Sequence, residues 1–304
     1  MVKPMTIMIK RKHPYFFAEV SGIDLAASLT NDTLAEILDA FAAHSVLLFR
    51  KQVLDDESQI AFSEHIGPLE KNITATFGNS RPEISKISNV DTNGNLLTTG
   101  SHDEIFLRGN SVWHTDSSFK IVPALGSALS AREVPPTGGE TEFADMRAAY
   151  DALDDRKKQF IEGRTAVHSF AFSQQQMNLD GRYNLNSVMS DEELEVLPPV
   201  QHPMVRVHPE SGRKAIYVGR HASHVIGLSI DEGRSLIEEL GDFGTQSKFV
   251  YRHKWEAGDL VMWDNRMVMH RGRPYDPKYK RVMHRTTIAG QAENNPWIVR
   301  NKVA

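Results

Sequence analysis

Short apolar runs rich in β-forming residues, each bounded by turn residues, constrain the fold of this 304-residue chain more than any other feature. Strands of this length and spacing are typical of jelly rolls and barrels. We therefore predict a mostly β fold with α-helices packed outside a jelly-roll or barrel core. The clearest runs span 214–218, 249–255, 260–263 and 282–289.

Helical patterns indicate where the outer layer should lie. Leu34, Ile37 and Phe41 recur at helical spacing immediately before an apolar strand at 45–49, so this helix should pack against the sheet. The segment 145–162 can form one or two helices. Further helical patterns span 56–65 and 229–240, and Gly241 should end the latter.

Composition limits the class of protein. With 304 residues and 40% hydrophobic content the chain can bury a full core, so we predict a single domain over 1–304 with a peripheral tail at about 291–304. The net charge is −4 and the basic residues are scattered, which gives no electrostatic footprint for nucleic acid or an anionic membrane. The sequence contains neither a signal peptide nor an apolar run of bilayer length, so we expect a cytoplasmic protein. We also expect a homo-oligomer.

His114, Asp116 and His270 form the candidate metal site. The absence of cysteine leaves His, Asp and Glu as the only strong metal ligands. His114 and Asp116 are two residues apart, so in an extended strand both side chains leave the same face, and a sheet can bring His270 back to them. Two imidazoles and one carboxylate form the facial triad that holds non-haem Fe(II) with open coordination positions. Taken alone, however, a His-x-Asp motif is more often an ordinary surface pair.

A segment rich in arginine follows His270. Arg281 and Arg285 are four residues apart, so along a strand they share a face, and a guanidinium matches a carboxylate through two parallel hydrogen bonds. Such a pair could hold two anions. The alternative is that both arginines are solvated surface charges, which is the usual fate of this residue type.

The combined spacing resembles a known enzyme family. His114-x-Asp116, the distant His270, and arginines 11 and 15 residues beyond it look like the Fe(II)/2-oxoglutarate dioxygenases of the TauD/TfdA family. This resemblance implies a double-stranded β-helix core with flanking helices. It also implies a ferrous ion as cofactor, with 2-oxoglutarate and O2 as cosubstrates. The most similar segments are 20–25, 138–153 and 262–266.

Carried over residue by residue, the resemblance implies roles at the iron and the cosubstrate. His114, Asp116 and His270 match the iron ligands. Thr141 matches a hydroxyl that helps to hold 2-oxoglutarate, and Arg281 matches the arginine that pairs with its distal carboxylate. In this family 2-oxoglutarate is converted to succinate and CO2, and a C–H bond of the primary substrate is hydroxylated.

The resemblance also implies where the primary substrate binds. Arg285 matches the arginine that meets its acidic group, although the two arginines could share their roles. Asn110 falls where the family places a pocket residue, but Asn-Ser is equally common in turns. Taurine-type enzymes carry a sulfonate-binding histidine where this chain has Glu70, and a carboxylate repels a sulfonate. Lys71, a further candidate for binding substrate, could partly compensate for that charge.

Within the family, the local similarity is greatest to the aryloxyalkanoate (2,4-D-type) dioxygenases. It covers 113–119, 135–139, 211–214 and 221–225. We therefore predict a small organic acid as substrate, hydroxylated next to an ether oxygen to give a hemiacetal that collapses to a phenol and a 2-oxo acid. The alternatives are a taurine or alkylsulfonate dioxygenase and a non-catalytic jelly-roll protein that binds a small acid.

The other histidines are interpreted as structural. His221 and His224 are three apart, and a second metal site would need more ligands than the local sequence offers. Five more have no partner that the sequence indicates and are expected to be packing or surface residues: His168, His202, His208, His253 and His284.

Overall fold

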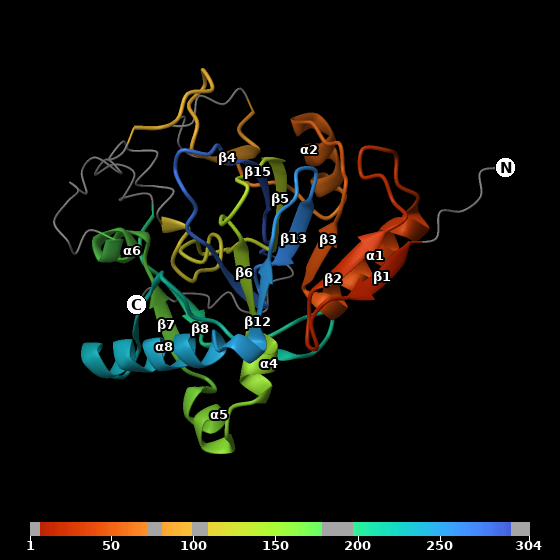
Figure 1. Ribbon diagram of the computed structural model, residues 1–304. Helices are drawn as coiled ribbons and strands as arrows, with labels where there is room; N and C mark the ends of the chain where they lie inside the picture. The colour runs from red at the N-terminus through yellow and green to blue at the C-terminus, as the bar shows by residue number, and fades with distance from the viewer. Residues whose placement is uncertain (1–6, 72–80, 99–108, 178–196, 293–304) are drawn as a thin grey trace.

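The computed structural model describes residues 7–71, 81–98, 109–177 and 197–292. A seven-stranded sheet, ordered β1-β2-β3-β13-β5-β15-β4, forms the larger half of its core (Figure 1). Its neighbouring strands are antiparallel except for β2 and β3, which are parallel. The strands are Met8–Arg11 (β1), Ala18–Ser21 (β2), Val46–Phe49 (β3), Ile84–Ser88 (β4), Gly126–Glu133 (β5), Leu260–Asp264 (β13) and Val282–Ile288 (β15).

A second, three-stranded sheet completes the core. Its order is β12 (Val250–His253), β6 (Thr141–Asp145) and β14 (Val268–Gly272), all antiparallel. Phe143 of β6 packs against Trp263 of β13 with ring centroids 5.6 Å apart, so side chains of both sheets share one apolar core. This arrangement confirms the predicted jelly-roll core. The runs predicted at 249–255, 260–263 and 282–289 correspond to β12, β13 and β15.

Two smaller sheets extend the fold. One has the order β11 (Ala222–Val225), β7 (Thr165–His168) and β8 (Val200–Pro203). The other pairs β9 (Val205–Val207) with β10 (Lys214–Ile216), which accounts for the apolar run predicted at 214–218.

Helices pack outside the sheets, as predicted. In Figure 1, α1 lies beside β1, β2 and β3, whereas α4, α5 and α8 gather below the sheets. Ile37 and Phe41 of α1 are buried in a core cluster with Leu47 and Phe49 of β3. Among the described residues no helix combines the length and the apolar character needed to cross a bilayer. The α-helices are Asn31–His44 (α1), Asp56–Glu64 (α2), Met146–Asp151 (α4), Asp155–Ile161 (α5), Phe170–Met177 (α6) and Ile230–Gly244 (α8).

The end predicted for α8 was wrong. The helix begins at a capping box formed by Ser229 and Glu232, but it runs through Gly241 and ends at Gly244. Leu240 and Gly244 are both buried on its packed face. A glycine inside a helix costs only about 1 kcal/mol, which the packing of this amphipathic face outweighs.

Candidate metal centre

His114 and His270 are brought together by an isolated antiparallel β-bridge. The backbone N–H of His114 donates to the carbonyl of His270 at 3.1 Å, and the reverse bond is 2.8 Å. Asp116 Oδ1 lies 3.8 Å from His114 Nε2, and Asp116 Oδ2 lies 3.8 Å from His270 Nε2. One ligand atom from each residue lies within 4.8 Å of the others, and all three residues are buried. Separations of this size suit three ligands that share one ion.

The backbone here differs from the extended strand expected for His114 and Asp116. Only His114 makes a β-bridge, and a turn begins at Asp116. Ser117 adopts a left-handed backbone with φ of 55°, which a strand does not accommodate. The turn nevertheless directs the carboxylate of Asp116 towards both histidines.

Burial sets the charge of the two histidines. His114 Nδ1 lies 2.7 Å from the carbonyl of Val112, which can only accept, so Nδ1 carries the proton and Nε2 keeps its lone pair for a metal. Burial lowers the pKa of His114 well below its usual value, and nearby His270 lowers it further. Burial also lowers the pKa of His270 to about 4, against the opposing effect of Asp116. Both imidazoles are therefore neutral near pH 7, as metal binding requires.

Asp116 is held as a carboxylate by donors from two parts of the chain. Ser127 Oγ donates to its Oδ2 at 2.7 Å, and Arg285 Nη1 donates to its Oδ1 at 2.6 Å. Its backbone N–H donates to Asn265 Oδ1 at 3.2 Å. Burial alone would raise the pKa of Asp116, but Arg285 and the two histidines outweigh it, so the pKa falls below its ordinary value. The side chain is therefore ionised.

Arg281 is a buried cation that contacts Gly139, two residues before the candidate cosubstrate residue Thr141. Only 8% of Arg281 is exposed, and its Nε donates to the carbonyl of Gly139 at 3.2 Å. No carboxylate of the described residues lies within ion-pair distance of it, and burial lowers its pKa to about 10. Thr141 Oγ1 accepts the indole N–H of Trp255 at 3.0 Å, so its own hydroxyl hydrogen is left for another acceptor. This donor set fits a carboxylate ligand.

The two arginines are not related by simple strand alternation. Arg281 precedes β15, and the pairing of β15 with β5 shifts register between Val282 and Met283. Arg281 therefore contacts Gly139, whereas Arg285 contacts Asp116.

Asn110 and Lys71, the other predicted substrate residues, differ in their exposure to solvent. The carbonyl of Asn110 accepts from Gly272 at 2.7 Å, and its buried Nδ2 has no hydrogen-bond partner among the described residues. Lys71 has a side chain that is 73% exposed, with Nζ 3.9 Å from Glu83 Oε1.

Glu70 is neutralised by a residue that we did not predict. Lys120 Nζ donates to Glu70 Oε2 at 2.6 Å, and Ser117 Oγ donates to the same atom at 2.8 Å. Lys120 follows Asp116 by four residues, but nothing in that spacing points to Glu70. Lys120, and not Lys71, thus balances the charge of Glu70.

Three histidines that seemed to lack partners pair with carboxylates, which corrects that expectation. His208 Nε2 lies 2.9 Å from Asp264, His253 Nε2 lies 3.0 Å from Asp259, and His284 Nδ1 lies 2.5 Å from Asp56. In two of these pairs the carboxylate is distant in the sequence and is brought close only by the fold.

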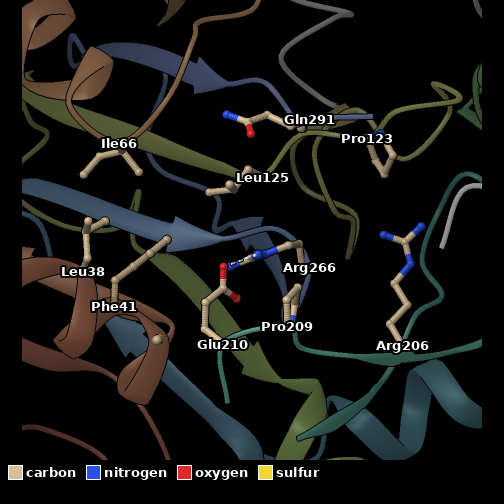
Figure 2. A pocket seen from close by; sticks show the side chains of 12 residues that line it. Leu38, Phe41, Ile66, Pro123, Leu125, Arg206, Pro209, Glu210, Arg266 and Gln291 are labelled. Atoms are coloured by element: carbon tan, nitrogen blue, oxygen red, sulfur yellow. Dashed lines mark hydrogen bonds and ion pairs between the residues drawn. The ribbon is translucent and has the colours of Figure 1, made fainter. Parts of the chain in front are cut away.

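A cavity of about 610 Å³ lies beside the segment that follows β13 (Figure 2). Arg266 Nη1 and Glu210 Oε1 form an ion pair of 3.0 Å in its lining, and Figure 2 marks this pair with a dashed line. None of the three triad residues lines this cavity, so it is separate from the candidate metal centre. Its apolar lining includes Leu38, Phe41, Ile66, Pro123, Leu125 and Pro209.

Comparison with known proteins gives consistent results. The family model described as taurine catabolism dioxygenase TauD, TfdA family, matches residues 9–287. The chain is 43% identical to an alpha-ketoglutarate-dependent 2,4-dichlorophenoxyacetate dioxygenase of Cupriavidus pinatubonensis, over 95% of this chain and 99% of the relative. It is 39% identical to an (S)-phenoxypropionate/alpha-ketoglutarate-dioxygenase of Sphingobium herbicidovorans, over 90% and 92% of the two chains.

A solved structure agrees with these matches. AAD-2, crystallised in complex with Mn(II) and N-oxalylglycine, matches this structure with a TM-score of 0.86 and 42% identity. The match covers 94% of this chain and 98% of AAD-2. The extent of these matches and the jelly-roll fold agree, and the chain belongs to the TauD/TfdA family of dioxygenases.

Proposed function

We propose that this chain is an Fe(II)- and 2-oxoglutarate-dependent dioxygenase that hydroxylates an aryloxyalkanoate at the carbon next to its ether oxygen. The resulting hemiacetal collapses to a phenol and a 2-oxo acid, while 2-oxoglutarate leaves as succinate and CO2. The activities of the relatives from Cupriavidus and Sphingobium support this substrate class. The observation that carries the proposal is a buried His-Asp-His cluster combined with a buried arginine that no described carboxylate pairs.

We assign the ferrous ion to His114, Asp116 and His270. Their neutral imidazoles and ionised carboxylate supply one negative charge and three ligand atoms, which suits a divalent cation with open positions. When bound, ferrous iron with O2 and 2-oxoglutarate supplies the oxidant that hydroxylates the substrate carbon. The side chains of the protein hold the reactants and exclude water from the site.

We assign 2-oxoglutarate to Arg281 and Thr141. A desolvated guanidinium gains most from a carboxylate when it has no other counter-ion, and Arg281 meets that condition among the described residues. Thr141 can donate its hydroxyl hydrogen to the same molecule because Trp255 already occupies an acceptor position of its oxygen.

We assign the carboxylate of the primary substrate to Arg285. Its Nη1 already donates to Asp116, but a guanidinium has five N–H groups, and its buried Nε has no partner among the described residues. We also predict that Asn110 and Lys71 contribute to binding of the primary substrate. The unpartnered Nδ2 of Asn110 is a donor available to a ligand.

The test is a coupled product assay. Purified chain with Fe(II), ascorbate and 2-oxoglutarate is offered 2,4-dichlorophenoxyacetate or taurine, and succinate and phenol are quantified. We expect one phenol for each succinate with the ether acid and little succinate with taurine. Faster turnover of taurine would favour a sulfonate dioxygenase. Binding of the ether acid without substrate-dependent succinate would favour a non-catalytic binding protein.

A further inference from the structure

A buried chain of hydrogen bonds lies behind the carboxylate of Asp116. Ser127 Oγ donates to Asp116 Oδ2 at 2.7 Å, and Asn265 Nδ2 donates to Ser127 Oγ at 3.0 Å. Asn265 Oδ1 accepts the backbone N–H of Asp116 at 3.2 Å and the indole N–H of Trp263 at 2.9 Å. Ser127 and Asn265 are fully buried, and Trp263 is 1% exposed. Every polar atom of these side chains is therefore used.

The direction of each bond in this chain is fixed. An indole N–H and a backbone N–H can only donate, and both meet the same side-chain atom of Asn265, so that atom is the oxygen. The amide nitrogen must then face Ser127 and donate to its hydroxyl. Ser127 has one hydrogen to give, and it goes to Asp116. The orientation of the carboxylate thus depends on atoms that cannot exchange their roles.

The same network also reaches a second residue of the triad. The ring of Trp263 packs against the ring of His270 with centroids 4.6 Å apart. His270 Nδ1 is buried and has no hydrogen-bond partner among the described residues, so ring packing is what orients this imidazole. Trp263 therefore connects the packing of His270 to the amide that holds Asp116.

We infer that Asn265 and Ser127 are positioning residues that fix the carboxylate of Asp116 for metal binding. This inference rests on the proposed function, because it takes Asp116 as a ligand of the ferrous ion. Residues that orient a metal ligand from behind typically contribute about 10- to 100-fold to metal affinity. A purely structural role predicts instead that loss of either residue weakens the fold and leaves the metal affinity of the folded protein unchanged.

Ser130 provides a matched control on the same strand. Like Ser127 it lies in β5 and is buried, with 4% exposed, and its Oγ donates to Gln59 Oε1 at 2.6 Å. Because it is three residues from Ser127, it lies on the other face of the strand. Removing the Ser127 hydroxyl deletes its bonds to Asp116 and Asn265, and removing the Ser130 hydroxyl deletes its bonds to Gln59 and to the carbonyl of His284. Only Ser127 contacts the triad.

The experiment measures Mn(II) binding to metal-free protein from the electron paramagnetic resonance signal of free Mn(II). We expect Ser127→Ala to raise the Kd for Mn(II) by about 10- to 100-fold, and Ser130→Ala to change it by less than about threefold. The midpoints of urea unfolding of the metal-free variants should fall by similar amounts. Equal weakening of Mn(II) binding by the two variants would overturn the inference.

Asn265→Ala is the second variant, because it removes the acceptor of the Asp116 backbone N–H together with the donor to Ser127. If neither Ser127→Ala nor Asn265→Ala weakens Mn(II) binding by more than about threefold, the inference is wrong. His114→Ala separates this outcome from failure of the proposed function. Unchanged Mn(II) binding by His114→Ala would refute the ligand assignment itself, whereas its loss leaves the result for Ser127 to decide the inference alone.

Discussion

Replacing Arg281 with methionine tests the cosubstrate site. The substitution should weaken the binding of 2-oxoglutarate but should not lower the stability of the cosubstrate-free protein. In the protein without cosubstrate, Arg281 is 8% exposed, and its guanidinium has a hydrogen bond to Gly139 but no carboxylate partner among the described residues. With 2-oxoglutarate bound, the proposed distal carboxylate supplies the missing counter-ion. Arg281→Met should therefore weaken the complex with 2-oxoglutarate without destabilising the cosubstrate-free protein.

The magnitude follows from the burial of this residue. Removing one partner of a buried ion pair costs about 3–5 kcal/mol, because the other charge stays desolvated. At about 1.4 kcal/mol for each factor of ten, the KM for 2-oxoglutarate should rise by about two to three and a half orders of magnitude. Burying an unpaired cation is costly, so replacing it with an apolar side chain of similar length should be neutral or stabilising in the cosubstrate-free protein. The free energy of unfolding without cosubstrate should thus stay within about 1 kcal/mol of the wild type or rise.

Two measurements check this prediction. Initial rates of succinate release across a range of 2-oxoglutarate concentrations give KM, and urea unfolding of the cosubstrate-free protein gives stability. Arg273→Met is the control, because Arg273 lies nearby in the sequence but its side chain is 36% exposed, with Nη1 3.9 Å from Glu142. A KM for 2-oxoglutarate that changes no more in Arg281→Met than in Arg273→Met would refute the reasoning, as would a loss of several kcal/mol in the free protein.

Four other outcomes can be measured. His114→Ala should abolish turnover by removing one of the three proposed metal ligands, with retained folding checked by circular dichroism. Arg285→Gln should raise both the KM for the ether acid and the Kd for Mn(II), because Arg285 also holds Asp116. A change in the KM for 2-oxoglutarate alone would instead assign Arg285 to 2-oxoglutarate and Arg281 to the primary substrate. Burial lowers the pKa of His202 to about 3 in the folded protein. Between about pH 3 and 6.5, His202 is therefore protonated in the unfolded chain but not in the folded protein. Stability should be lost as pH falls through that window, and His202→Asn should flatten the decline measured by urea unfolding. Asp154→Ala removes the N-cap of α5 and should cost about 1 kcal/mol in the same assay.

The strands and helices were largely predictable because they bury one face. The periodicity of Leu34, Ile37 and Phe41 marked α1, and the apolar runs marked β12, β13 and β15. Pairing was not predictable in the same way. β13 lies between β3 and β5, which are distant from it in the sequence, and β2 pairs with β3 in parallel. Such pairings are decided by the whole core and not by the pattern of any one strand.

Some residues of the candidate site were likewise predictable from the sequence, and others were not. His114, Asp116 and His270 were predictable because ligand chemistry limits the residue types and the family resemblance limits their spacing. Ser127, Asn265 and Lys120 were not, since each is chemically ordinary and acquires its role only from the neighbour that folding supplies. The best signal for Asn265 was its place between Trp263 and Arg266, close before His270, but that position does not reveal a bond to Asp116.

The choice between a carboxylate and a sulfonate substrate cannot rest on Arg285 alone. Its guanidinium can pair with either anion, and it already donates to Asp116. From the sequence, repulsion by Glu70 argued against a sulfonate, yet Lys120 and Ser117 both donate to that carboxylate. The pair formed by Glu70 and Lys120 has no net charge, so simple repulsion loses most of its force. Selection should therefore depend on the shape and hydrogen bonding of the pocket, which explains why the activities of relatives carry the substrate proposal further than the charge of Glu70 does.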